Sequence, residues 1–560
     1  MASGTSFTPS AVTKINGEDA YIFLEALSQL GQQQDPDSLY NNLMFSLPFN
    51  VASEGSWQGY FGGSGRYGYE YPGNSTVLTF ENGTTTEFIT TATLLASFSG
   101  VMDGESFYQK FCTGSQPAAA ASNASSAAST SSAPMATATF STTPAIGYPK
   151  PQIISSDQVV SGYFLPAPYG DVAVLAMVSF EPRSPPEFQY VVQTFLAMAK
   201  AAGKKKLVVD VSANGGGYIF QGYDAFPQLF PHTVQYGYNR WREHEAFDIV
   251  SEQFSALIPA DYNPDTASNF LINIFESPFN WRFDLSVHDT RFSSYEDKFA
   301  PHEYQGDNFT AIMRWNFTDP LLTINATYGI GMDITGYRSR KGFHQPFDAD
   351  DIVLLYDGYC ASTCTLFSEF MRLQGPVRSI ALGGRHTNTG AMQGVGGTKG
   401  ANNYAYGDIL SVVQTAYQSG TAEQQANWTI LTTYTDLPIQ RSTDTSLNAR
   451  DDILPQDRND GTPAQFVIEE ADCRLYYTAE MIMDMNAVWS AAADAAWGGG
   501  KCVAGRGFGG QKKRAVVDRD VERRNVDDFQ VVPISFPVKR ADDSAAFSAW
   551  QAKHGRKAPL

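Results

Sequence analysis

The chain is poor in charged residues and in long apolar runs, and each shortage excludes a class of protein. Only 17% of its 560 residues are charged, and acidic residues outnumber basic ones by 58 to 39, for a formal net charge of −19. Such an acidic chain repels nucleic acid and anionic membranes, so neither is expected as a partner. No run of eighteen or more apolar residues occurs, so no membrane span is predicted.

Cysteine is scarce as well. The chain has five cysteines and they have no zinc-finger spacing. No metal or organic cofactor is implied. What the chain does have is 43% hydrophobic residues, which is typical of a folded protein, and a length that predicts two or more domains.

The most informative stretch is an apolar run, Ile352 to Tyr356, that leads into Gly358-Tyr-Cys-Ala-Ser-Thr-Cys364. Apolar residues then recur at helical spacing from Leu366 onward, so we predict a strand, a tight turn and a helix. Ser362 falls where the helix begins. A hydroxyl there suits nucleophilic catalysis, because the free N–H groups of a helix N-terminus can stabilise an oxyanion. The alternative is that Ser362 only caps the helix.

A second apolar run, from Leu207, ends in Asp210-Val-Ser-Ala-Asn-Gly-Gly-Gly217. Successive glycines allow close backbone approach and present N–H donors to a ligand oxygen. The run lacks the Gly-x-Gly-x-x-Gly of a dinucleotide site, and no Gly-Lys-Ser/Thr follows it as in a phosphate loop.

Together the two motifs resemble those of the tail-specific serine proteases, peptidase family S41, with a strand–Asp-x-x-x-Asn-x-Gly-Gly turn and a later strand–Gly-x-x-Ala-Ser turn. The chain is most similar to the fungal secreted branch related to chlamydial protease-like activity factor, on Cys360 to Cys364 and on Glu469 to Arg474. The resemblance implies a mixed α/β, crotonase-like peptidase core with Ser362 as nucleophile. It also implies an oxyanion hole from the backbone N–H of Gly216 or Gly217 together with Thr363.

The two motifs do not include the general base that would accept the Ser362 proton. In the family, a catalytic histidine in an Asp-Gly-His-like motif precedes the segment that aligns with Ser10 to Ala20, so we expect either a shortened chain or a degenerate protein. Bacterial members use a lysine about two dozen residues after the serine, where this chain has His386, twenty-four residues after Ser362. His386 is the alternative base, since an imidazole is competent near neutral pH. The orienting acid stays open.

The Ile-Asn-Gly turn near Ile15 resembles the middle of a PDZ-like domain, a module that binds peptides by strand addition. An Ala/Ser/Thr-rich stretch and a basic tail frame the remaining core. The expected divisions are a partial PDZ-like, β-rich module at 1–112, a linker at 113–148, the peptidase core at 149–500 with its main motifs at 170–400, an aromatic insertion at 240–345, and a disordered tail at 501–560.

The compartment is predicted indirectly. Ten residues at the N-terminus show no signal peptide, yet the sequons and the resemblance favour the secretory pathway or the extracellular space. The predicted N-glycosylation sites are Asn74, Asn82, Asn123, Asn308, Asn316, Asn325 and Asn427. Five cysteines permit two disulfides of unknown connectivity, and Cys360 and Cys364 either pair elsewhere to stiffen the turn or act as small buried hydrophobes.

The predicted function is a serine endopeptidase that hydrolyses a polypeptide or precursor peptide through Ser362. Similar members occur in gene clusters for ribosomally made cyclic peptide mycotoxins of the ustiloxin and phomopsin kind, which makes precursor processing a hypothesis. The alternatives are a catalytically inactive secreted peptide-binding protein that keeps the fold but lacks the base, and a lipid- or retinoid-binding relative of the fold.

Overall fold

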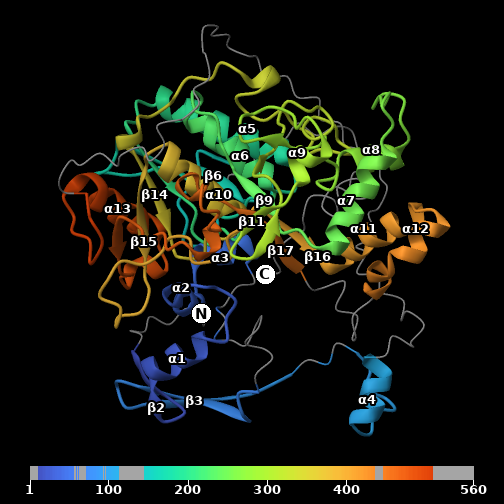
Figure 1. The fold of residues 1–560 in the computed structure, drawn as a ribbon. Helices are drawn as coiled ribbons and strands as arrows, with labels where there is room; N and C mark the ends of the chain where they lie inside the picture. Colours follow the sequence, from blue (N-terminus) through green and yellow to red (C-terminus); the bar gives the residue numbers. More distant parts are fainter. Residues whose placement is uncertain are drawn as a thin grey trace, which may run out of the picture.

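The computed structural model describes residues 10–55, 59, 61, 71–92, 94, 96–112, 144–435 and 446–508. A large α/β body holds the two motifs, and a smaller N-terminal sheet lies beside it (Figure 1). The tail beyond 508, most of the Ala/Ser/Thr-rich stretch and Asn123 lie outside the described residues. Within the described residues, no helix combines the length and apolarity that crossing a bilayer requires.

The body is built on a seven-stranded sheet in the order β18-β15-β14-β8-β7-β6-β5. Within this sheet, β7, β8, β14, β15 and β18 run parallel to one another, while β6 is antiparallel to both of its neighbours, β5 and β7. The central strands are apolar and buried throughout, as expected for parallel strands covered on both faces. Their bounds are β5 Ile153–Ile154, β6 Val160–Phe164, β7 Val172–Met177, β8 Lys206–Asp210, β14 Ile352–Tyr356, β15 Arg378–Leu382 and β18 Cys473–Leu475.

Helices cover both faces of this sheet, because alternate strand residues point to opposite sides. Leu354 belongs to the apolar core beneath α5, α6 and α10. Its neighbours Val353 and Leu355 pack in a second core with α13. The bounds are α5 Pro185–Ala201, α6 Ile219–Leu229, α10 Thr363–Glu369 with a π-helical continuation η5 at Phe370–Gln374, and α13 Met485–Ala493 with the π-helical η11 at Asp494–Gly498.

The long segment between α6 and β14 forms a satellite region with part of the chain after residue 400. Its five-stranded sheet has the order β10-β13-β9-β17-β16. The strands are β9 Asn239–Trp241, β10 Leu285–Ser286, β13 Met313–Arg314, β16 Asn402–Ala405 and β17 Ser446–Asp452, and a separate hairpin joins β11 His302–Tyr304 to β12 Asp307–Phe309. The helices are α7 Glu245–Leu257, α8 Asn269–Phe275, α9 Tyr295–Phe299, α11 Tyr406–Ser419 and α12 Ala422–Asn427.

Aromatic side chains of this region are buried. Trp241, Phe247 and Phe299 share one apolar cluster, and Trp315 and Phe317 belong to the main core. They fill cores, as large rings usually do. Short 3-10 turns complete the body at Arg338–Arg340, Ala349–Asp351, Thr429–Thr433, Pro455–Asp457, Ala464–Phe466 and Glu480–Ile482.

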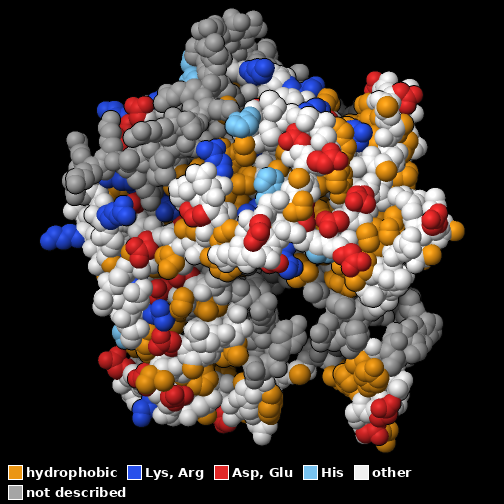
Figure 2. All heavy atoms as spheres, viewed as in Figure 1, with side chains coloured by type: hydrophobic (Ala, Val, Ile, Leu, Met, Phe, Trp, Pro, Cys, Tyr) orange, Lys and Arg blue, Asp and Glu red, His pale blue; other side chains and the backbone are white. Residues whose placement is uncertain are grey.

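The N-terminal part is a four-stranded antiparallel sheet in the order β2-β1-β3-β4, followed along the chain by an outlying helix. Figure 2 shows apolar side chains gathered on that helix, α4. Phe107 and Tyr108 of α4 are exposed, as is Met102 just before it. The elements are β1 Val12–Ile15, β2 Glu18–Asp19, α1 Ala20–Ser28, α2 Pro36–Asn42, α3 Leu47–Ala52, β3 Ser75–Phe80, β4 Thr85–Ile89 and α4 Gly104–Phe111.

Candidate active site

The serine turn joins the carboxyl end of β14 to the start of α10, as the sequence predicts. Ser362 has a φ of 50° and a ψ of −123°, an unusual conformation for a residue with a side chain. Its N–H donates to the carbonyl of Thr398 at 2.7 Å, and its carbonyl accepts the N–H of Thr365 at 2.8 Å. The backbone is therefore held on both sides of the nucleophile candidate.

The Ser362 side chain does not cap the helix. It makes no capping hydrogen bond to α10, although Ser362 stands at the N-cap position. It is half-buried, whereas its neighbours Ala361 and Thr363 are buried. A serine held in a strained turn without the usual capping bond favours the catalytic interpretation over the capping one.

The glycine turn lies directly against this serine, although 146 positions separate Gly216 from Ser362. Gly216 has a φ of 103°, and a Cβ built on it would lie 2.7 Å from the Cβ of Ser362 and 3.0 Å from the N of Thr363. A side chain at 216 would collide with the nucleophile turn. The close approach therefore requires glycine here.

Two of the three predicted oxyanion donors have N–H groups that no described residue accepts. These are Gly217 and Thr363, the first residue of α10. The N–H of Gly216, in contrast, donates to Oδ1 of Asn214 at 2.9 Å. The hydroxyl of Thr363 donates to the carbonyl of Gly217 at 2.9 Å, so the two turns are hydrogen-bonded to each other. Of the predicted set, Gly217 and Thr363 have the better-placed N–H groups.

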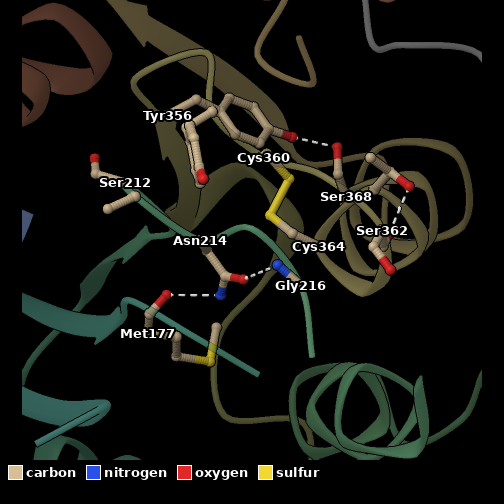
Figure 3. The surroundings of a disulfide bond; sticks show 12 residues. Met177, Ser212, Asn214, Gly216, Tyr356, Cys360, Ser362, Cys364 and Ser368 are labelled. Atoms are coloured by element: carbon tan, nitrogen blue, oxygen red, sulfur yellow. Dashed lines mark hydrogen bonds between the residues drawn. A yellow bond between two sulfur atoms is a disulfide. The ribbon is translucent and has the colours of Figure 1, made fainter. Parts of the chain in front are cut away.

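Asn214 connects the glycine turn to its surroundings and is completely buried. Its side-chain Nδ2 donates to the carbonyl of Met177 at 2.8 Å (Figure 3), and its backbone carbonyl accepts the N–H of Ala361. Asn214 thus links β7, the glycine turn and the serine turn.

Asp357 holds the same two turns together and was missed by the sequence reasoning. Its carboxylate accepts the N–H of Ala213 at 2.8 Å and the N–H of Tyr359 at 3.0 Å. Burial raises the pKa of Asp357 to about 6. The available signal was an aspartate at the end of each apolar run, Asp210 on β8 and Asp357 after β14.

Asp210 is anchored from the face of the sheet that α13 covers. It accepts the indole N–H of Trp489 at 2.7 Å and the N–H of Ser212 at 2.9 Å. Burial raises the pKa of Asp210. A fully buried tryptophan of α13 thereby supports the first residue of the glycine motif.

The N-terminal part of the chain also contacts the serine turn. The Ser38 hydroxyl of α2 donates to the carbonyl of Gly358 at 2.6 Å. The Asn41 amide donates to the carbonyl of Asp357 at 2.7 Å. Helix α2 therefore packs against the serine turn at the carboxyl end of β14.

The structure does not bring His386 to Ser362. His386 is exposed, and its ring lies 3.9 Å from that of Tyr21 in α1, centroid to centroid. Its loop is held by Arg474, whose guanidinium donates to the carbonyls of Gly383 and Arg385. Among the described residues no hydrogen bond joins His386 to the serine, so its role as base remains a prediction.

The nearby lysine and glutamates are engaged elsewhere. Lys399 is an ion-pair partner of Glu469 at 2.9 Å, and Arg372 binds the same carboxylate at 3.0 Å. Glu369 faces the buried interior, where burial and then repulsion from Asp452 raise its pKa well above the usual range. Among the described residues, no hydrogen bond joins any of these groups to the Ser362 side chain.

The two cysteines beside the nucleophile are bonded to each other rather than to cysteines elsewhere. Cys360 and Cys364 form one disulfide, and Cys473 and Cys502 form another, while Cys112 is free. The expectation of pairing elsewhere or of two unpaired buried residues is wrong. The first disulfide encloses Ser362 (Figure 3).

A pocket of about 340 Å³ opens beside the two turns, at the carboxyl ends of β8, β14 and β15. Ser212 and Asp357 belong to its polar lining, mostly apolar side chains from 40–49 and 476–488 line much of the rest, and Ser362 is not among the lining residues. The ends of parallel strands are the usual place for ligands in open α/β sheets.

One predicted glycosylation site conflicts with the fold. Asn316 is only 3% exposed, and its Oδ1 accepts the N–H and the hydroxyl of Thr318. A glycan has no room on a buried side chain, so the prediction for Asn316 is wrong. Exposed positions are Asn74, Asn82, Asn308 and Asn427, and Asn325 is half-buried.

Comparison with known proteins supplies the family. The chain is 31% identical over 553 residues to the peptidase S41 family protein phomP1 of Diaporthe leptostromiformis, covering 89% of this chain and 78% of the relative. The chain belongs to the peptidase S41 family. This S41 chain is also 32% identical over 376 residues to the peptidase S41 family protein ustP of Aspergillus flavus, covering 64% of the chain and 75% of the relative.

The N-terminal module has its own match, a family model of the CPAF-like PDZ domain over residues 1–99, which confirms the predicted PDZ-like module. Mature CPAF aligns with 88% of this S41 chain and 77% of its own, at 13% identity and a TM-score of 0.40. Membership of the S41 family places the protein in the broad class of serine proteases.

Proposed function

We propose that the chain is a serine endopeptidase whose nucleophile is Ser362. The observation that carries this is the Ser362 turn itself. A half-buried hydroxyl with no capping bond stands at the start of α10, in contact with Gly216 and beside the unaccepted N–H groups of Gly217 and Thr363. Such an arrangement supplies a nucleophile and an oxyanion hole in one place.

The reaction proposed is acyl transfer to serine. The Ser362 oxygen attacks a peptide carbonyl carbon and its proton passes to a general base. The developing oxyanion accepts from the N–H groups of Gly217 and Thr363, with Gly216 next to them. The C–N bond then breaks, the amine leaves with the proton, and water hydrolyses the ester.

The substrate proposed is a polypeptide or a precursor peptide. The pocket beside the two turns has a mostly apolar lining that suits apolar side chains of a peptide, and the PDZ-like module is of a kind that binds peptides. Processing of the precursor of a ribosomally made cyclic peptide mycotoxin rests on the resemblance alone. The exposed sequons and two disulfides support a secretory location.

The second candidate is an inactive peptide-binding protein. It is favoured by one observation: among the described residues, no base contacts the Ser362 hydroxyl, and His386 lies on Tyr21. This protein would keep the pocket and the PDZ-like module without forming an acyl-enzyme.

Labelling with a fluorophosphonate probe separates the two. The parent, Ser362→Ala and the exposed-serine control Ser411→Ala are treated with the probe and weighed as intact proteins. An adduct on the parent and the control, absent from Ser362→Ala, supports the peptidase. An unlabelled parent supports the binding protein.

The same assay tests the base. His386→Ala should label far more slowly than the parent if this imidazole accepts the Ser362 proton. An unchanged rate would remove His386 from the site, since Tyr21 contact alone does not serve catalysis.

A further inference from the structure

The disulfide between Cys360 and Cys364 closes a short ring with Ser362 at its middle position. The two Cα atoms are 5.3 Å apart, and the cysteines are four positions apart in the sequence. Both side chains are completely buried in the main apolar core. In Figure 3 the sulfur bridge lies between Ser362 and the strand that ends at Tyr356.

The conformation that competes in principle with this turn is a helical one. Helix α10 begins at Thr363, and a serine with a φ of 50° would lose its strain by joining that helix. In an α-helix, residues four positions apart have Cβ atoms about 5–6 Å apart, whereas a disulfide holds its two Cβ atoms at about 3.5–4.5 Å. The crosslink between Cys360 and Cys364 therefore opposes extension of α10 backwards through Ser362.

Other contacts act in the same sense but are hydrogen bonds that thermal motion can break. The carbonyl of Cys360 accepts the N–H of Gly397 at 3.2 Å, and the N–H of Ser362 donates to the carbonyl of Thr398 at 2.7 Å. Both pair the serine turn with segment 397–398. If Ser362 entered the helix, the second bond would be lost and the hydroxyl would leave its place beside Gly216.

We propose that the Cys360–Cys364 disulfide is a positioning device that holds Ser362 in its reactive conformation. The inference rests on the proposed function, because it concerns the reactivity of the same serine. The disulfide does not touch the substrate. It acts by excluding the helical alternative of the turn, so that opening the bridge slows acylation and leaves substrate binding unchanged.

The matched control is the other disulfide. Cys473 and Cys502 also have Cα atoms 5.3 Å apart, but this bridge joins β18 to the segment after η11. The variants to compare are Cys360→Ala/Cys364→Ala and Cys473→Ala/Cys502→Ala. Each removes one bridge, and only the first frees the serine turn.

The readout is the kinetics of fluorophosphonate labelling, separated into the maximal rate of inactivation and the half-saturating probe concentration. Misplacing a nucleophile by a fraction of an ångström predicts a fall of at least about tenfold in the maximal rate for Cys360→Ala/Cys364→Ala, with the half-saturating concentration unchanged. The control should label like the parent. Equal maximal rates for the two variants would overturn the proposal.

A second measurement covers the case in which Cys360→Ala/Cys364→Ala does not fold. In Cys112→Ser/Cys473→Ala/Cys502→Ala the bridge beside Ser362 is the sole disulfide possible. A dithiol then reduces it: the S–S bond breaks, two thiols form, and the dithiol is oxidised to its own disulfide. Labelling should slow on reduction and recover on reoxidation. A labelling rate insensitive to reduction of this bridge would contradict the inference.

The two hypotheses fail in different ways. An unlabelled parent refutes the proposed function, whatever the bridge does. The bridge is then tested by hydrogen exchange, since the N–H of Ser362 is protected by its bond to Thr398. Loss of that protection in Cys360→Ala/Cys364→Ala but not in the control supports the positioning role. Equal protection in both refutes it.

Discussion

Replacing Gly216 by alanine tests whether the two turns form one site. The new Cβ would lie 2.7 Å from the Cβ of Ser362, 2.9 Å from the carbonyl of Ala361 and 3.0 Å from the N of Thr363. Ordinary contacts of this kind begin at 3.4 Å. The serine turn must therefore move, because none of these three atoms is the end of a flexible side chain.

Two effects combine in this variant. The φ of 103° costs an alanine about 1–3 kcal/mol of stability, as for other left-handed residues. Relief of the closest contact requires a displacement of about 0.7 Å, the difference between 3.4 and 2.7 Å, shared between the turns. Since a misplacement of about 1 Å costs roughly 100-fold in rate, labelling of Ser362 should slow by about 30- to 100-fold.

Gly499→Ala is the matched control. Gly499 has a φ of 92° and no atom within 4 Å of its built Cβ, so alanine there meets the backbone strain without the collision. Both variants should lose stability in urea unfolding, while only Gly216→Ala should lose labelling. If Gly216→Ala reacts with the probe as fast as Gly499→Ala does, the glycine turn does not constrain Ser362, and the inference that the two turns form one site is refuted.

Three further variants address the groups that support the turns. Because burial raises the pKa of Asp357 from 3.8 to about 6, its contribution to folding stability falls as the pH rises between those values. Asp357→Asn should lack this change in the free energy of unfolding, measured in urea at pH 4.5 and 7. The same variant should react more slowly with the probe, because an amide oxygen replaces only one of the two acceptors of Asp357. Trp489→Phe removes the donor to the buried carboxylate of Asp210 and should cost about 1.5–3 kcal/mol in the same assay; a loss equal to that of a surface variant would refute the bond. Arg474→Gln should leave 383–390 open to limited proteolysis, since the guanidinium donates to four carbonyls of that loop, and unchanged cleavage there would contradict this role.

Much of the fold could be predicted from local pattern. The apolar run Ile352 to Tyr356 is β14 without change of bounds, and the run that begins at Leu207 lies in β8. Uninterrupted apolar runs of five or six residues are typical of buried parallel strands. The same run therefore predicts both that the segment is a strand and that it lies in the buried centre of the sheet. The start of α10 directly after Ser362 was also predicted from local pattern.

Contacts between distant segments were decided by packing. Nothing in the spacing of Asp357 from Ala213 shows that one carboxylate would accept N–H groups from both turns. Burial of Asn316 and the position of His386 on Tyr21 are likewise set by which surfaces meet in the folded chain. A motif records the residue types that a site needs, but not which of them the fold brings together.

Local patterns predicted the two strand–turn units and a serine at a helix start, because strand periodicity, glycine content and helix starts are local properties, while the α/β class was implied by the family resemblance. Contact between Gly216 and Ser362 and the pairing of Cys360 with Cys364 came from the folded structure. Disulfide connectivity and close backbone approach depend on distances in space, which chain separation does not encode.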